Sequence, residues 1–277
     1  RLPRRTSKLG DSISEKLTKG DTAVCVFNTF DPGDLDAFKG YLSGEEDEMP
    51  PGDPMTIFLE ALSRAKADPE VKNFVVDISG NMGGSVDLVH ALTAILSGEN
   101  ETEIVCQNTL DGQFYTEFYE IDTNMDGKFD EADKEVTCDL RIAVLTSRIS
   151  FSCGNLFPAM MKDKGVLIMG EQSGGGACAI QCMATADGIC YQISSHRMHM
   201  LDGSGGQVDF GVPVDVDLIG KNPDGSDRMV SVQIDGILST DDGRISSDEI
   251  EVKIPDYSEF YDLERLSGEI NAFYDGK

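Results

Sequence analysis

Ser152 is the residue whose type and position point most directly to chemistry. It stands between the apolar run 142–145, typical of a strand buried on both faces, and 156–161, whose spacing favours a helix. At such a junction a serine hydroxyl lies beside the free N–H groups of a helix N-terminus, which favour developing negative charge. A serine before a helix is also the usual N-cap, so this position alone allows both interpretations.

Two further stretches have the same strand-then-glycine arrangement. The expected strand 74–78 is followed by Gly83-Gly84 and an expected helix, 86–96. The expected strand 166–169 runs into the glycine loop 174–176. Glycines at such junctions let a substrate approach bare backbone N–H groups, which is what an oxyanion hole requires.

Three patterns therefore follow one another along the chain. They are Asp-x-x-x-Asn-x-Gly-Gly from Asp77, Ser-x-Ser-x-x-Asn from Ser150 and Gly-Glu-x-Ser-x-Gly from Gly170. In order and spacing they resemble the core of the C-terminal-processing (tail-specific) serine proteases, which the tricorn core protease shares. The resemblance covers roughly residues 20 to 220.

The resemblance implies a fold and an activity. The fold would be α/β, a crotonase-like and Clp-protease-like spiral of strand-strand-helix units. The activity would be that of a serine endopeptidase acting on polypeptide through an acyl-enzyme, with Ser152 as the nucleophile. The backbone N–H groups of Gly84 and Cys153 would hold the oxyanion. Cys153 itself is the alternative nucleophile.

The expected general base is missing from the pattern. In tail-specific proteases a lysine stands where this chain has Ala177, whereas Gln181 matches the residue that orients that lysine. The histidine that tricorn-like relatives carry on the first strand is also absent. Of the remaining histidines, His90 is expected on a helix surface, and His196 and His199 on opposite faces of one strand, which leaves His196 as the candidate base. The alternative is a catalytically inactive, peptide-binding homologue.

An acidic loop between the core motifs predicts a metal site. Residues 122–133 follow the calcium-loop template Asp-x-Asn-x-Asp-Gly, with Gly127 at the sharp turn. We expect a structural Ca²⁺ site, and a metal-free acidic hairpin tip is the alternative. The expected ligands are Asp122, Asn124, Asp126, the Lys128 carbonyl, Asp130 and Asp133.

The chain is expected to divide into an arm (1–20), an α/β core (21–220) with an inserted hairpin carrying the calcium-type loop (103–139), and an acidic extension (221–277). Helix 55–67 and strand 23–27 belong to the expected core, and 31–54 to an exposed connection.

The composition limits which classes of binding partner and which cellular location are expected. A net charge of −27 argues against nucleic acid, and no apolar run reaches the roughly 18 residues of a membrane span. The seven cysteines lack a zinc-type spacing, so free thiols are expected over a disulfide within the 178, 182 and 190 group. The acidity, the calcium-type loop and the resemblance favour an extracellular or cell-envelope location.

Overall fold

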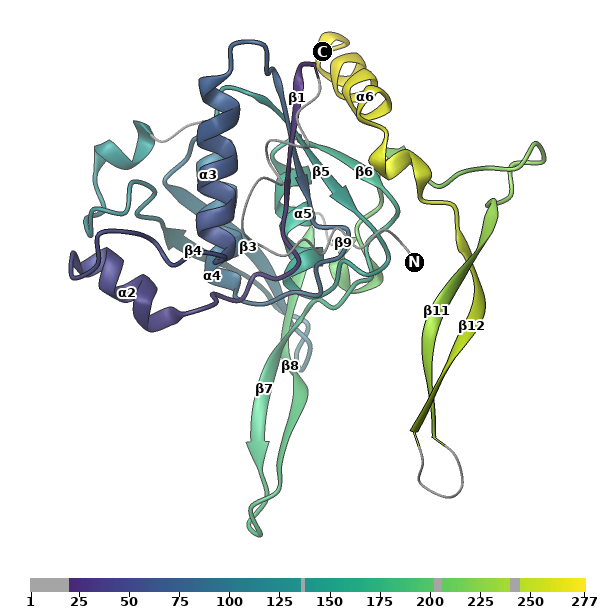
Figure 1. Ribbon diagram of the computed structural model, residues 1–277. Coiled ribbons are helices and arrows are strands. Elements are labelled where there is room, and N and C mark those ends of the chain that lie inside the picture. Colours follow the sequence, from purple (N-terminus) through teal and green to yellow (C-terminus); the bar gives the residue numbers. More distant parts are fainter. Residues whose placement is uncertain (1–19, 136–137, 202–205, 240–244) are drawn as a thin grey trace.

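The computed structural model describes residues 20–135, 138–201, 206–239 and 245–277. A central sheet in which every neighbouring pair is parallel forms the body of the protein (Figure 1). Its strands, in spatial order, are β1 (Thr22–Val26), β2 (Asn73–Asp77), β5 (Arg141–Thr146), β6 (Leu167–Gly170) and β10 (Val216–Asp217).

Three helices cover one face of this sheet. They are α3 (Pro54–Ala67), α4 (Val86–Ser97) and α5 (Cys153–Asp163). Side chains such as Phe74 and Val144 pack with them in the larger core cluster. Two of these helices begin at residues whose side chains cap them. Asp53 and Ser85 accept hydrogen bonds from N–H groups in the first turns of α3 and α4, respectively.

The opposite face of the sheet is covered by the C-terminal segment. The short helix η3 (Ser258–Tyr261) and α6 (Leu263–Asp275) pack against strand residues such as Val75 and Leu145. Successive strand residues therefore alternate between two buried faces, which is why these strands read as unbroken apolar runs. The amphipathic stretch near the C-terminus packs on its own domain.

A second, antiparallel sheet has the order β4-β3-β8-β7, with β9 (Gly206–Gln207) beside β8. The segment expected to be an insertion supplies two of its strands, because β3 pairs with β8. Strands β7 and β8 project from the body together as a hairpin, called the arm of β7 and β8 below (Figure 1). The strands are β3 (Glu101–Asn108), β4 (Phe114–Glu120), β7 (Cys178–Ala184) and β8 (Cys190–Leu201).

Several expectations need correction. The connection 31–54 contains helix α2 (Leu35–Ser43), and the extension expected to be loop-rich forms a hairpin of β11 (Met229–Ser239) and β12 (Ile245–Pro255). The calcium-type loop is not at a hairpin tip. It follows β4 and leads into the short helix η1 (Glu131–Glu135). The strand-strand-helix spiral stays a prediction. The N-terminal arm expected over residues 1–20 lies outside the described residues apart from residue 20.

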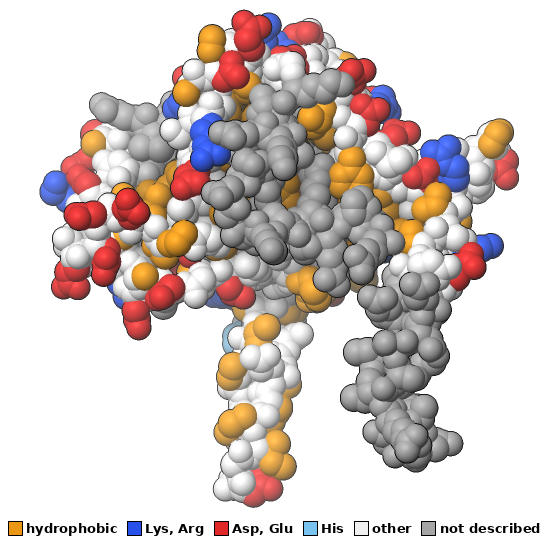
Figure 2. Space-filling view, viewed as in Figure 1, with side chains coloured by type: hydrophobic (Ala, Val, Ile, Leu, Met, Phe, Trp, Pro, Cys, Tyr) orange, Lys and Arg blue, Asp and Glu red, His pale blue; other side chains and the backbone are white. Residues whose placement is uncertain are grey.

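The described surface is strongly acidic. Figure 2 shows Asp and Glu side chains spread over the body, whereas the arm of β7 and β8 presents mostly apolar and uncharged side chains. Among the described helices, none combines the length and the hydropathy that crossing a bilayer would require.

The packing of α6 yields a stability prediction. Leu266 is fully buried against the sheet, so Leu266→Ala should lower the free energy of unfolding by about 2 to 5 kcal/mol through lost apolar contact and a cavity. Denaturant unfolding followed by circular dichroism measures this. The exposed α3 variant Glu60→Ala should change stability by no more than about 0.5 kcal/mol. Equal stability of Leu266→Ala and the parent would show that α6 does not contribute to the core.

Candidate active site

Ser152 adopts a backbone conformation that is costly for a residue with a side chain. Its φ is 54° and its ψ is −119°, and Met125 is the other non-glycine residue with positive φ among those described. Such a conformation costs on the order of 1 to 3 kcal/mol unless neighbours impose it. The Ser152 side chain makes no capping hydrogen bond to α5. The N-cap interpretation is therefore wrong, and the hydroxyl is left available.

Backbone hydrogen bonds on both sides impose this turn. Ser152 N–H donates to the Gly175 carbonyl at 3.0 Å, and Phe151 N–H donates to the Asn81 carbonyl at 3.1 Å. The Ser152 carbonyl accepts the first N–H groups of the α5 ladder, from Asn155 and Leu156 at 2.8 Å each. The turn is thus held between the loop after β2 and the glycine loop after β6.

The glycine pair lies directly against this turn. A Cβ built on Gly83 would be 2.8 Å from Ser152 Cβ, closer than real Cβ atoms approach, and 3.1 Å from Cys153 N, which is a tight contact. Cys153 Sγ donates to the Gly84 carbonyl at 3.0 Å. Within the described part of the chain, the N–H groups of Gly84 and Cys153 have no hydrogen-bond acceptor. Two free donors therefore lie near the serine, as an oxyanion hole requires.

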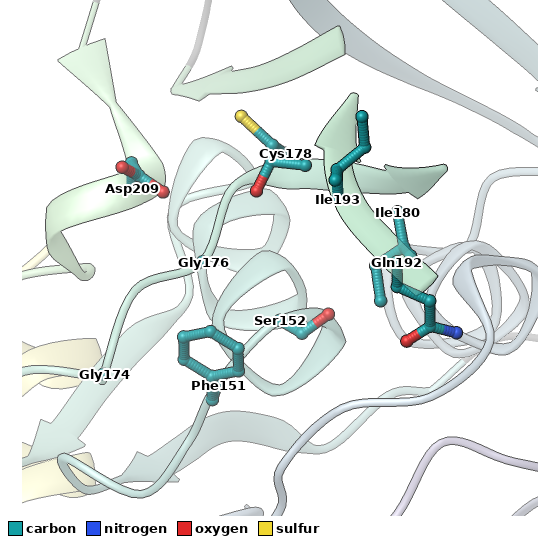
Figure 3. A pocket seen from close by; sticks show the side chains of 10 residues that line it. Phe151, Ser152, Gly174, Gly176, Cys178, Ile180, Gln192, Ile193 and Asp209 are labelled. Atoms are coloured by element: carbon teal, nitrogen blue, oxygen red, sulfur yellow. The ribbon is translucent and has the colours of Figure 1, made fainter. Parts of the chain in front are cut away.

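The hydroxyl of Ser152 faces an open pocket of about 400 Å³ (Figure 3). The turn and the glycine loop form one wall, β7 and β8 form a second, and Asp209 in the short helix η2 (Val208–Phe210) closes one side. Its lining residues are Phe151, Ser152, Gly174, Gly176, Cys178, Ile180, Gln192, Ile193, Ser194 and Asp209.

Two motif residues that are not in the pocket hold its parts together. Ser173 Oγ donates to Asn155 Oδ1 at 2.6 Å and accepts from Val212 N–H at 2.7 Å. Asn155 Nδ2 donates to the Val208 carbonyl at 2.8 Å. Both side chains are buried. This network links α5, the glycine loop and η2, so the spacing of the motifs reflects structural hydrogen bonds around one free serine.

Comparison with known proteins identifies this arrangement. The family model of peptidase family S41 matches residues 50–218, which span all three motifs. The chain belongs to peptidase family S41. The resemblance to C-terminal-processing serine proteases is thereby confirmed. No curated protein sequence matches the chain.

Solved structures with similar folds include a lipoprotein from Streptococcus agalactiae (16% identity, TM-score 0.50, covering 72% of this chain and 62% of that one). A putative peptidase from Parabacteroides merdae (15%, TM-score 0.50, 74% and 56%) and mature CPAF (16%, TM-score 0.50, 74% and 48%) are also similar. At these identities the likeness concerns the fold. This S41 chain spans less than two thirds of the length of each of these structures.

None of the three histidines of this S41 chain lines the pocket. His90, expected on a helix surface, is fully buried, with Nδ1 2.7 Å from Thr102 Oγ1 and its ring stacked on Tyr119 at 3.8 Å. Burial, and less strongly the neighbouring His199, lowers the pKa of His90 to about 4. Burial, with Arg197 nearby, also lowers the pKa of His199 to about 4. Both rings are therefore neutral at physiological pH.

His196 is exposed, whereas His199 is buried. The pairs Cys178↔Met198 and Ile180↔Ser194 show that β8 advances four residues where β7 advances two, so His196 lies in a bulge of β8 beside the pocket-lining Ser194.

The positions that correspond to the family's lysine and its partner do not form a basic site. Ala177 is buried, and its N–H donates to Asp209 Oδ1 at 3.1 Å. Gln181 is exposed on β7 opposite Ile193 and is not among the lining residues. Among the residues that the structure describes, no lysine, arginine or histidine lines this pocket.

The acidic loop 122–133 is ordered by its own backbone. Asp122 accepts from Asp126 N–H at 3.1 Å and from Gly127 N–H at 2.8 Å, and Asp133 accepts from Asp130 N–H at 2.9 Å. Gly127 has a φ of 80°, as the sharp turn of the template requires. Among the residues described, no group of three or more His, Cys, Asp or Glu side chains is arranged to hold a metal ion.

The pocket also contains residues that the sequence motifs did not indicate. Three of them lie in segments distant from the serine in sequence: Asp209, Gln192 and Ile193. Another, Phe151, occupies an unspecified position of the motif that contains Ser152. The signal nearest to Asp209 is the Asp-Phe-Gly-Val-Pro-Val stretch that resembles a family segment. Hydrogen bonds of η2 to the glycine loop and to Asn155 of α5 bring it to the site.

The thiol next to the serine is chemically quiet. Burial raises the pKa of Cys153 to about 11, so at neutral pH it is a thiol and a poor nucleophile. Iodoacetamide should therefore modify the exposed Cys182 and Cys190 first, and Cys153 only as the pH approaches 11 or the chain unfolds. Peptide mapping by mass spectrometry measures the order. Rapid modification of Cys153 in the folded protein at neutral pH would contradict this prediction and support Cys153 as the alternative nucleophile.

Proposed function

We propose that this S41 chain is a serine endopeptidase that cleaves polypeptide through an acyl-enzyme on Ser152. The observation that carries the proposal is the backbone conformation of Ser152. Its neighbours hold it at a costly positive φ, and the hydroxyl lies in the pocket without a capping hydrogen bond to α5. A purely structural serine at a helix start would form the N-cap bond, because that bond stabilises the helix by about 1 kcal/mol.

In the proposed reaction Ser152 Oγ attacks the scissile carbonyl carbon, and the carbonyl oxygen becomes an oxyanion. The N–H groups of Gly84 and Cys153 then donate to that oxygen. Collapse of the tetrahedral intermediate, with the proton removed from the Ser152 hydroxyl passed to the leaving nitrogen, releases the amine product and leaves an ester on Ser152. Water then hydrolyses this ester. Both donors lie next to the serine and have no acceptor within the described chain, so this placement supports the proposal.

The proton of the serine hydroxyl needs an acceptor, and His196 is the candidate. It is exposed, it lies in the β8 bulge, and bulges beside active sites redirect side chains. Gln181 stays a candidate for orienting the base only if the arm of β7 and β8 moves. In the structure it lies on β7 opposite Ile193 and does not line the pocket.

A fluorophosphonate probe tests the activity. It should label the folded wild-type chain at Ser152, and Ser152→Ala should abolish labelling, whereas the distant Ser43→Ala should retain it. His196→Ala should slow labelling if this residue accepts the proton. Tryptic mapping of the labelled protein by mass spectrometry locates the adduct.

Absence of labelling in a folded sample, beside a serine hydrolase that labels under the same conditions, would refute the peptidase proposal. The alternative would then apply, a catalytically inactive homologue that binds extended peptide. The observation that favours this alternative is that no basic side chain of the described part of the chain lines the pocket.

We also propose an extracellular or cell-envelope location. The support is the net charge of −27 and the description of the similar Streptococcus agalactiae protein as a lipoprotein.

A structural Ca²⁺ site in residues 122–133 is the remaining proposal. The donors are all oxygen atoms, which suits a hard cation, and the backbone already makes the turn of the template. The carboxylates do not converge in the structure, so binding would exchange their bonds to backbone N–H groups for bonds to the ion.

Calcium should accordingly raise the melting temperature, because an ion that binds the folded state alone stabilises it by mass action. Asp126→Ala should abolish this response, and Asp139→Ala, an acidic change outside the loop, should retain it. Differential scanning fluorimetry with calcium and with EDTA measures the shift. An unchanged wild-type melting temperature at saturating calcium would contradict the proposal.

A further inference from the structure

Asp209 is held in the pocket by the loop opposite it. Its Oδ1 accepts from Ala177 N–H at 3.1 Å, and its main-chain carbonyl accepts from Gly176 N–H at 3.3 Å. The carboxylate is thus anchored through one oxygen. Its Oδ2 has no hydrogen bond or ion pair within the described part of the chain.

Other acidic side chains near the core are paired. Asp215 contacts Lys162 at 2.8 Å, and Glu171 and Asp256 form ion pairs with Arg148 and Arg228. Asp209 has no such partner among the described residues, and none of the other lining residues carries a charge that could offset it. Its negative charge is felt within the pocket, because burial and then Asp209 raise the pKa of Cys178. Asp209 is therefore an exposed carboxylate whose charge no other described lining residue offsets.

The lining of the pocket indicates what kind of cationic group could pair with Asp209. Asp209 and Gln192 lie on opposite sides in Figure 3, with Ser152 below and between them. Apolar side chains also line the space, including Phe151, which is 45% exposed, and Ile193, which is 45% exposed. A lysine or arginine side chain can lay its aliphatic stem along such walls while its charged end meets the carboxylate.

We propose that Asp209 is a specificity-determining residue that selects polypeptide segments with a lysine or arginine close to the bond presented to Ser152. This inference rests on the proposed function for the position of the scissile bond. The overall charge of −27 attracts cationic chains without choosing a position along them. Asp209 would supply the position, because it is one carboxylate at a set place in the pocket.

Binding to the full chain with Ser152→Ala tests this apart from catalysis. Short fluorescein-labelled peptides of one uncharged sequence, with Lys, Met or Glu placed at each position in turn, are titrated and followed by fluorescence anisotropy. At one position we expect Lys to bind about twofold to fivefold more tightly than Met, and Glu more weakly, as for an ion pair with an exposed carboxylate. The preference should shrink as salt is added.

Asp209→Asn in the same background is the matched variant. The asparagine oxygen can still accept from Ala177 N–H, so the loop stays anchored while the charge is lost. It should abolish the preference of Lys over Met at that position. Glu70→Gln, exposed and distant from the pocket, makes the same change in net charge and should preserve the preference.

Equal binding of Lys and Met peptides at every position, a preference that survives Asp209→Asn, or no binding of any peptide would overturn the inference. Failure of the proposed function is separate, because it appears as absent fluorophosphonate labelling of wild type. A chain that is not labelled but still prefers Lys through Asp209 would lose its assignment as an enzyme and keep this subsite.

Discussion

The site depends on one imposed backbone conformation, the positive φ of Ser152. Three segments produce it together, since the loop after β2 holds Phe151, the glycine loop after β6 holds Ser152, and α5 begins immediately afterwards. Gly83 is required because any side chain there would meet Ser152 Cβ. The energy stored in this turn, on the order of 1 to 3 kcal/mol, is offset by hydrogen bonds that also align the neighbouring N–H donors.

This arrangement follows from parallel strands buried on both faces. The carboxyl ends of adjacent parallel strands emerge at the same edge of a sheet, and β2, β5 and β6 are neighbours in it. The three loops that follow them therefore meet there, although they are far apart along the chain. Helices on one face and α6 on the other pack against these strands, so the geometry of the turn at Ser152 depends on packing distant from the serine.

Sequence alone located much of this frame. The predicted core strands and helices agree with the observed elements to within about two residues, because strand runs and capped helices are local signals. The three motifs identified the loops that meet at Ser152. What sequence could not supply depended on contacts between distant segments. His90 is buried because Tyr119 of β4 covers its ring on α4, and Asp209 reaches the pocket through contacts of η2 with the glycine loop and with α5.

The substitution at the lysine position separates the fold of the site from its chemistry. Ala177 is buried among Ala159, Val208 and Val212, so the space near the loop is filled by apolar packing. The loop keeps its shape because Ser173 and Asn155 hold it to α5 and because Asp209 accepts the Ala177 N–H. None of these contacts needs a basic side chain. The turn at Ser152 and the free N–H groups of Gly84 and Cys153 can therefore keep their arrangement with an alanine at position 177, so this geometry does not depend on a basic side chain at that position.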